Sequence, residues 1–164
     1  MNTPLWIRRK YFDSYGNRSN EQEALVPPRG MRLTCPCCGY LTLGERGADE
    51  ICYLCSWEDD GQDDPQADER RGGPNQDYSL TEARQNFENY MVMYPPDCDI
   101  RIGGSDSELA RKVKREIIAA FDKMQAEPTS DELNDLWRVI ATGEKALDKE
   151  LKRIIREYSS QNEA

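Results

Sequence analysis

Two short cysteine pairs decide the fold: Cys35-Pro36-Cys37-Cys38-Gly39-Tyr40 and Cys52-Tyr53-Leu54-Cys55. A tight turn with cysteine at its first and fourth positions aims both sulfurs at one point. Two such turns, brought together, supply the four sulfur ligands of a tetrahedral metal site. Pro36 presets φ inside the first turn, and Gly39 can adopt the positive φ that follows it. The pattern therefore predicts a metal centre built on two cysteine turns.

The residues between the pairs predict how the turns are joined. Residues 40–43 are strand-like, residues 44–47 are turn-like, and Ile51 begins a second extended segment. This order is typical of a zinc-ribbon hairpin. Thirteen residues separate Cys38 from Cys52, slightly fewer than the ~15–20 usual for such sites.

The expected ligands of one structural Zn²⁺ are Cys35, Cys38, Cys52 and Cys55. Cys37 lies inside the first turn, so it is the alternative to Cys38, although the spacing favours Cys38. Cys98 is remote in sequence, and we expect an ordinary thiol there. A thioredoxin-type redox pair is the rival interpretation of residues 35–38, but such a pair opens a helix in a βαβ pattern.

The chain of 164 residues contains no histidine. This excludes Ser-His-Asp and Cys-His catalysis, histidine-ligated metals and the commonest acid-base group at neutral pH. Four cysteine thiolates also leave no open position on the metal for a substrate. We therefore expect a protein that is not an enzyme.

The charge is concentrated in one segment. The chain has 22 basic and 31 acidic residues, and nine of the acids lie in residues 49–69, which contain no lysine or arginine. The other 22 acids balance the 22 basic residues, so the net charge of −9 belongs to this acidic segment. Three interpretations are open: carboxylates that cap turns, a Ca²⁺ site without the EF-hand order, or a docking surface for a basic partner.

Under the docking interpretation, the surface would bind a basic protein such as a toxin domain. The sequence disfavours nucleic acid as a partner, because carboxylates flank the cysteines where phosphate contacts would need lysine or arginine. The predicted partner-binding residues are Trp57, Glu58, Asp59, Asp60, Asp63, Asp64 and Asp68. Trp57 has a second interpretation, as a core residue that closes the ribbon.

The compartment is expected to be the cytoplasm. The first ten residues lack the apolar region of a secretory signal, and no run approaches the ~18 apolar residues needed to span a bilayer. Closely spaced cysteine pairs in a cytoplasmic protein indicate metal or redox chemistry rather than disulfides.

Three capping-box patterns predict helices downstream: Ser79 with Glu82, Ser105 with Glu108, and Thr129 with Glu132. Gly143 would weaken or divide the last helix. The last two helices are amphipathic and closely connected, which predicts an antiparallel hairpin whose apolar faces form core rather than a coiled-coil seam. The face expected on the last helix consists of Leu133, Leu136, Trp137, Ile140, Leu147, Leu151, Ile154, Ile155 and Tyr158.

Residues 1–30 begin with aromatic side chains among Arg8, Arg9 and Lys10. A basic, aromatic segment can contact RNA or a membrane surface. The simpler expectation is that it packs on the body of the protein or complements the acidic segment within the chain.

The cysteine and acidic stretches resemble the bacterial cysteine-rich CPCC family over residues 31–125 or thereabouts. The segments that carry the resemblance are Cys35–Leu43, Glu50–Cys52, Cys55–Asp64, Gly72–Asn75 and Ser79–Phe87. The resemblance implies a small zinc-ribbon-like module with a following helix and no established catalytic activity. For some members it implies a role as immunity partner of a bacterial toxin. Tyr53-Leu54 departs from the Pro-Val expected there, between the ligands.

The predicted fold is α+β, with all parts expected in one compact domain: an extension (1–30), a zinc-ribbon-like module (31–78), two capped helices (79–126) and a long C-terminal helix (129–159). The predicted function is a non-enzymatic zinc-binding interaction module, such as an immunity protein that neutralises a toxin through its acidic surface. A nucleic-acid-associated zinc ribbon is the alternative, and a thiol-redox enzyme is the weaker one.

Overall fold

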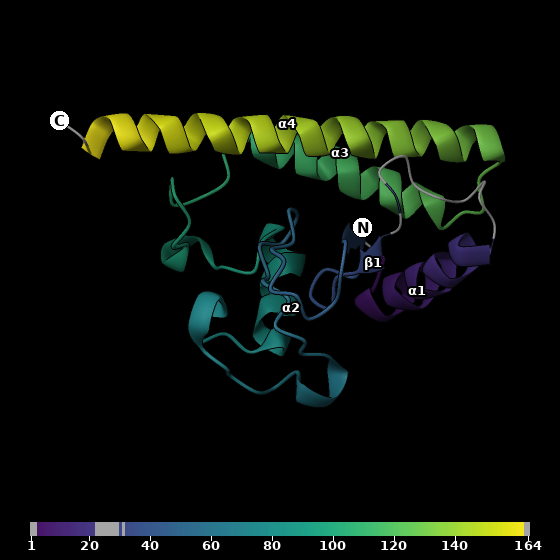
Figure 1. Cartoon of the computed structure of the whole chain (residues 1–164), viewed down its shortest axis with the longest axis horizontal. Helices are drawn as coiled ribbons and strands as arrows, with labels where there is room; N and C mark the ends of the chain where they lie inside the picture. Colours follow the sequence, from purple (N-terminus) through teal and green to yellow (C-terminus); the bar gives the residue numbers. More distant parts are fainter. Residues whose placement is uncertain (1–2, 22–29, 31, 163–164) are drawn as a thin grey trace. The chain divides into compact units, whose positions relative to one another are not determined.

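The computed structural model describes residues 3–21, 30 and 32–162, and the chain divides into two compact units at Met93 and Tyr94. Unit 1 contains helix α1 (Leu5–Glu21), strands β1 (Leu33–Thr34) and β2 (Leu41–Leu43), the 3-10 turns η2 (Asp64–Gln66) and η3 (Gly73–Asn75), and helix α2 (Leu80–Tyr90). Unit 2 contains the turn η4 (Pro96–Cys98) and helices α3 (Glu108–Met124) and α4 (Ser130–Asn162) (Figure 1). The predicted α+β class is confirmed.

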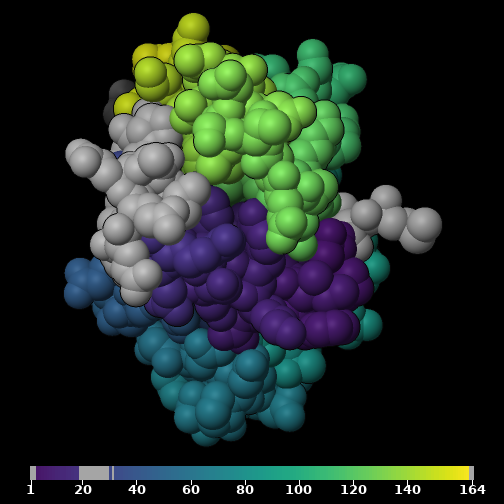
Figure 2. Space-filling model, turned by 90° about the vertical axis from the view of Figure 1, so that its right-hand side faces the viewer, coloured from purple at the N-terminus to yellow at the C-terminus, as the bar shows by residue number. Residues whose placement is uncertain are grey.

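Helix α1 packs on the cysteine-bearing part of unit 1. Phe12 and Tyr15 are buried on its inner face. The Phe12 ring meets Tyr40 edge-on with centroids 5.9 Å apart, and Tyr40 meets Phe87 of α2 at 6.3 Å. Aromatic contacts of this geometry add to the stabilisation from burial alone. Figure 2 shows α1, in purple, lying across the blue and teal part of unit 1. The expectation that the basic, aromatic start packs on the body is confirmed for α1, and residues 22–29 lie outside the described part.

The small sheet differs from the predicted hairpin. Strand β2 occurs where it is expected, but it pairs antiparallel with β1, in the register Leu33↔Leu43, across the first cysteine pair. Ile51 instead bridges Glu58 across the second pair. Each cysteine turn brings the residues on its two sides within hydrogen-bonding distance. Each turn is therefore closed by its own flanking residues and not by the other turn. Residues 44–50 form the loop between them.

Helix α2 begins as the sequence predicts. The Ser79 hydroxyl accepts a hydrogen bond from the Glu82 amide, and the Glu82 carboxylate accepts one from the Ser79 amide, so the capping box is complete. The helix buries Leu80, Ala83 and Phe87. It ends at Met91, which has a left-handed backbone conformation with φ 60°.

Helix α3 begins at a different serine from the predicted one. Ser107, not Ser105, is the N-cap: its hydroxyl accepts a hydrogen bond from the Ala110 amide at 3.1 Å. The same hydroxyl donates to Glu150 of α4 at 2.7 Å. This long-range contact favours Ser107 over the local capping box. Thr129 and Glu132 form the predicted reciprocal contacts at the start of α4.

The predicted antiparallel helical hairpin is confirmed. Contacts run in opposite order along the two helices, from Ser107 with Glu150 to Phe121 with Trp137, whose rings meet edge-on with centroids 5.9 Å apart. Lys114 of α3 is buried and pairs with Asp106 at 2.6 Å.

Only part of the predicted apolar face of α4 is core. Leu133, Trp137 and Ile140 are buried, whereas Leu151 and Tyr158 are about half exposed. Helix α3 has 17 residues and α4 has 33, so α4 extends past its partner, as Figure 1 shows at its yellow end. No described helix combines the length and the apolar composition needed to cross a bilayer.

Helix α4 is unbroken at Gly143, contrary to one of the sequence expectations. A Cβ atom at this position would lie 2.6 Å from Ile117 Cγ1 and 3.4 Å from Val113 Cγ1. The glycine therefore lets α3 and α4 approach closely, which offsets its low helix propensity.

We predict that Gly143→Ala destabilises the helical hairpin. Alanine favours an isolated helix by about 1 kcal/mol, but the added methyl group overpacks the Ile117 contact, and we expect a net loss of about 1–2 kcal/mol. Urea unfolding followed by circular dichroism measures this loss. Thr142→Ala, at the exposed neighbouring position, is the control and should be neutral or slightly stabilising; an equal gain for both variants would contradict the close approach.

Candidate metal centre

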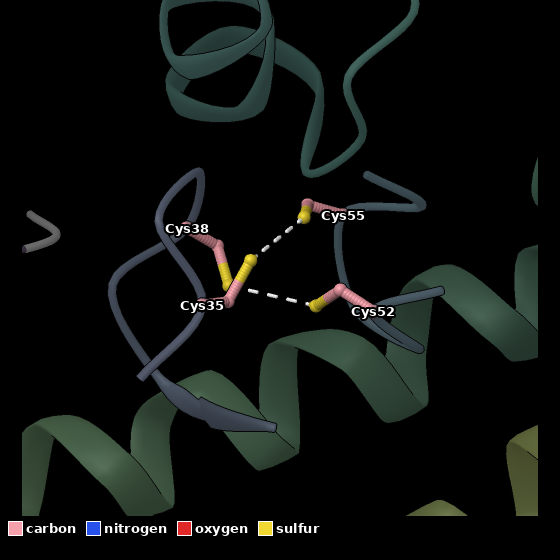
Figure 3. Close-up of side chains that lie close together, drawn as sticks. All are labelled: Cys35, Cys38, Cys52 and Cys55. Carbon is pink, nitrogen blue, oxygen red and sulfur yellow. Dashed lines mark hydrogen bonds between the residues drawn. The ribbon is translucent and has the colours of Figure 1, made fainter. Parts of the chain in front are cut away.

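The first cysteine turn is a closed loop of six residues. The Cys35 amide donates to the Tyr40 carbonyl at 2.9 Å, and the Gly39 amide donates back to the Cys35 carbonyl at 2.9 Å. Gly39 has φ 77°, in the left-handed region that favours glycine. The loop directs the Cys35 and Cys38 side chains to the same side (Figure 3).

The second cysteine turn repeats the first, residue for residue. The Cys52 amide donates to the Trp57 carbonyl at 2.9 Å, and the Ser56 amide donates to the Cys52 carbonyl at 2.8 Å. Ser56 occupies the position equivalent to Gly39 and also has a positive φ, 66°. Trp57, like Tyr40 in the first turn, is fully buried. The repeat of the backbone pattern explains why two different sequences present cysteine sulfurs in the same way.

The four sulfurs converge on one point. Cys35 Sγ lies 3.7 Å from Cys55 Sγ, and Cys38 Sγ lies 3.7 Å from Cys52 Sγ; all four lie within 4.8 Å of one another (Figure 3). Metal–sulfur bonds of ~2.3 Å in a tetrahedron place neighbouring sulfurs about 3.8 Å apart, which these distances match. Disulfide sulfurs would be ~2.05 Å apart, and all four cysteines are free. The four cysteines are therefore placed to bind a metal ion, as predicted.

Burial makes the sulfurs dependent on a cation. All four side chains are fully buried. Desolvation raises the pKa of the Cys35 and Cys55 thiols well above their usual value, and it raises the pKa of Cys38 as well. Cys52 is desolvated too, but hydrogen bonds from the other three thiols lower its pKa well below the usual value. Four thiolates can share this space only if a bound metal ion offsets their desolvation and mutual repulsion.

A hydroxyl group supports the ligand set from β2. Thr42 Oγ1 lies 3.1 Å from Cys52 Sγ, and the threonine is buried. A hydroxyl that donates to a metal-bound thiolate orients the sulfur and stabilises its charge. Thr42 lies in the segment predicted as a strand, and no sequence pattern predicts its contact with the ligand set.

Residues distant in sequence hold the backbone of both turns. Arg84 Nε of α2 donates to the Pro36 carbonyl at 2.9 Å. The Met93 amide donates to the Cys55 carbonyl at 2.7 Å. Asn75 makes two hydrogen bonds with the backbone of Glu58, at 3.0 and 2.8 Å. These residues orient the ligands, and no local sequence pattern identifies them.

The other two cysteines lie outside the ligand group. Cys37 is buried in the first turn, and its thiol hydrogen-bonds with Cys55, which contributes to the raised pKa of Cys55. Cys98 is exposed in η4. The geometry therefore groups Cys38 rather than Cys37 with the other ligands.

Several carboxylates of the acidic segment hold the loop at residues 44–47. The buried Asp59 carboxylate accepts hydrogen bonds from the Gly47 amide at 2.7 Å and from Arg46 Nε at 2.8 Å. Glu50 accepts one from the Gly44 amide at 2.7 Å. These acids satisfy backbone donors, as the turn-capping interpretation of the segment predicts.

Arginines from both helices of unit 1 neutralise the next acids. Arg9 of α1 lies 2.6 Å from Asp63 and 2.6 Å from Asp64. Arg84 of α2 lies 2.7 Å from Asp64, and Arg46 lies 3.1 Å from Asp63. Burial opposes ionisation of Asp63, but the Asp64 amide, Arg9 and Arg46 lower its pKa overall. The expected complementarity between the basic start and the acidic segment is thus observed within the chain.

The predicted partner surface is smaller than the sequence indicates. Trp57 and Asp59 are fully buried, so neither side chain reaches the surface of unit 1. Asp68 is exposed and accepts a hydrogen bond from Thr81 at 2.6 Å. Within the described part of the chain, no set of three or more carboxylates converges as the four cysteines do, so the structure shows no carboxylate cluster for Ca²⁺ there.

A few acids of this segment have no ion pair or only a long one. Asp49 and Glu58 form no ion pair with a described residue, and Asp60 lies 4.0 Å from Arg71. Desolvation raises the pKa of Glu58, and the negative charges of Asp49 and Asp60 raise it further. We call these three residues the open acidic face.

Residues 33–99 match a protein-family model described as Cysteine-rich CPCC. This segment is similar to the Cysteine-rich CPCC family. The match confirms the family resemblance and contains both cysteine turns, the acidic segment and α2. It ends before α3, which the resemblance over residues 31–125 had included. No curated protein and no solved structure matches the chain.

We predict that serine at any one of the four ligand positions abolishes stoichiometric metal binding, because a hydroxyl replaces a thiolate in a closed tetrahedral set. Elemental analysis of the purified chain measures the metal content, about one ion per chain in the unchanged protein. Cys37→Ser and Cys98→Ser are matched controls that should keep the metal. Loss in Cys37→Ser together with retention in Cys38→Ser would contradict the ligand set.

We also predict opposite tolerances at the two equivalent positive-φ positions. In Gly39→Ala, the added Cβ would lie 2.8 Å from Leu5 Cδ1 on a backbone with φ 77°, so we expect a loss of stability of about 1–3 kcal/mol. Ser56→Gly relaxes a strained φ and should retain the metal. Thermal unfolding of the metal-loaded variants tests both, and equal stability of Gly39→Ala and the unchanged protein would contradict the close contact with α1.

Proposed function

We propose that the chain is a non-enzymatic zinc protein, whose metal centre has a structural role and whose unit 1 binds a basic protein partner. The observation that carries the structural role is the convergence of four fully buried sulfurs from two closed turns. All four positions of a tetrahedral ion would be filled by the protein, which leaves none for a substrate.

Zinc is the metal that this donor set fits best. Zn²⁺ has no redox chemistry and takes four thiolates in a tetrahedron. Iron also binds four cysteines, but it would colour the protein and respond to reductants. Elemental analysis and the visible spectrum of protein purified from its native cell distinguish the two. The free thiols that the site requires favour a reducing compartment, and we propose the cytoplasm.

We predict that metal removal unfolds unit 1 and leaves the helical hairpin. Strands of two and three residues cannot hold the cysteine turns without the ion. By contrast, α3 and α4 pack on each other through Ile117, Phe121 and Trp137. Limited proteolysis with mass spectrometry, with and without a chelator, should show rapid cleavage in unit 1 and a protected fragment near residues 94–162. Unchanged cleavage of unit 1 after verified metal loss would refute the structural role.

The open acidic face supports the proposed partner class. Asp49, Glu58 and Asp60 lack full internal compensation, and a metal ion with four thiolates adds two formal negative charges nearby in sequence. Such a field accelerates association with a basic protein. The partner that we propose is a toxin domain that the protein neutralises, as the family resemblance implies for some members.

We predict that the triple change Asp49→Asn, Glu58→Gln and Asp60→Asn weakens capture of the partner and reduces the salt dependence of its association rate. Affinity purification from the native cell supplies the partner, and stopped-flow mixing over a range of salt concentrations gives the rate. The triple change Glu116→Gln, Asp131→Asn and Asp135→Asn, at exposed positions of unit 2, removes the same number of charges and is the matched control. Capture of nucleic acid instead of protein, or equal capture by both variants, would count against this partner class.

A further inference from the structure

Arg8 of α1 is a cation in the interior of unit 1. Its side chain is fully buried. One terminal nitrogen donates to the Thr3 carbonyl at 2.6 Å, and the other pairs with Glu88, a carboxylate that is 39% exposed. The Nε–H group has no hydrogen-bond acceptor among the described residues. A buried guanidinium with one partly exposed carboxylate is incompletely compensated.

The guanidinium lies against the first cysteine turn. Its central carbon is 4.9 Å from the centre of the Tyr40 ring and 5.7 Å from that of Phe87. A Cβ atom on Gly39 would lie 3.4 Å from Arg8 Nε, and Gly39 directly follows the ligand Cys38. Helix α1 therefore places the buried Arg8 guanidinium next to the backbone that positions two of the four sulfurs.

The charges of the two groups are complementary. A divalent ion with four thiolates is formally −2, and the buried cysteines give that charge no access to solvent. Burial opposes the positive charge of Arg8, but Glu88, Tyr40 and Cys38 raise its pKa overall. Each buried charge is costly alone, and removing one of them leaves the other uncompensated.

We propose that Arg8 is the counter-cation of the metal-loaded thiolate centre, a positioning residue that strengthens metal binding and links the docking of α1 to it. The inference rests on the proposed metal centre and extends it to a helix outside the matched residues 33–99. If it holds, α1 is part of the metal site, although it supplies no ligand.

Two variants that break the same ion pair separate this role from ordinary packing. Arg8→Met removes the cation and should weaken metal binding by about 10–100-fold, the usual effect of losing a group that supports the ligands. Glu88→Gln leaves the cation and removes a competing negative charge, so metal affinity should stay equal or increase. Arg8→Lys keeps the charge and should recover most of the affinity. Arg9→Met, on the same helix, loses only its pairs with Asp63 and Asp64 and is the control.

The measurement is competition between the full-length protein and a chromophoric chelator for Zn²⁺, with Co²⁺ absorption as a second readout of the thiolate geometry. Equal weakening in Arg8→Met and Glu88→Gln, or no change in either, overturns the proposal. If Arg8→Met does not fold, weaker binding by Glu88→Gln or no recovery in a folded Arg8→Lys overturns it. Failure of the unchanged protein to bind metal would instead refute the proposed metal centre itself.

Discussion

The convergence of four cysteine sulfurs is the constraint on which the rest of unit 1 depends. Strands of two and three residues contribute few hydrogen bonds, and such a sheet is not stable alone. The cysteine turns are instead closed by their own backbone contacts and joined to each other through the sulfur cluster. A metal ion bound there would replace much of the core that a larger domain builds from apolar side chains.

The acidic segment is largely part of this architecture. Its carboxylates accept backbone hydrogen bonds in the loop at 44–47 and pair with arginines from α1 and α2. A net charge of −9 therefore does not describe a uniformly acidic surface. The buried Asp59 and the paired Asp63 act within the protein, and the open acidic face is what remains for a partner.

The sequence predicted those features that depend on short spacing. The cysteine ligands and the caps at Ser79 and Thr129 follow from residues three positions apart, where local geometry decides the outcome. The cap at Ser107 was missed because Glu150, 43 residues away, contacts its hydroxyl. The contact of Arg84 with Pro36 spans 48 residues and has no sequence signature. One missed feature did have a signal: the two cysteine pairs align as C-x-x-C-Gly-Tyr and C-x-x-C-Ser-Trp, which predicts the positive φ of Ser56 from that of Gly39.

The two turns are alike in backbone but differ in what supports them. The first contacts two cations, Arg8 over Tyr40 and Arg84 at the Pro36 carbonyl. The second is held by neutral donors, the Asn75 amide and the Met93 backbone. Support by cations depends on the charge of the centre, because an anionic thiolate cluster attracts a guanidinium and a set of neutral thiols does not. Support by neutral hydrogen bonds lacks this dependence. The half of the module that contacts α1 is therefore the half whose packing responds more strongly to the charge state of the cysteines, whereas the hydrogen bonds that support the second turn do not themselves depend on that charge.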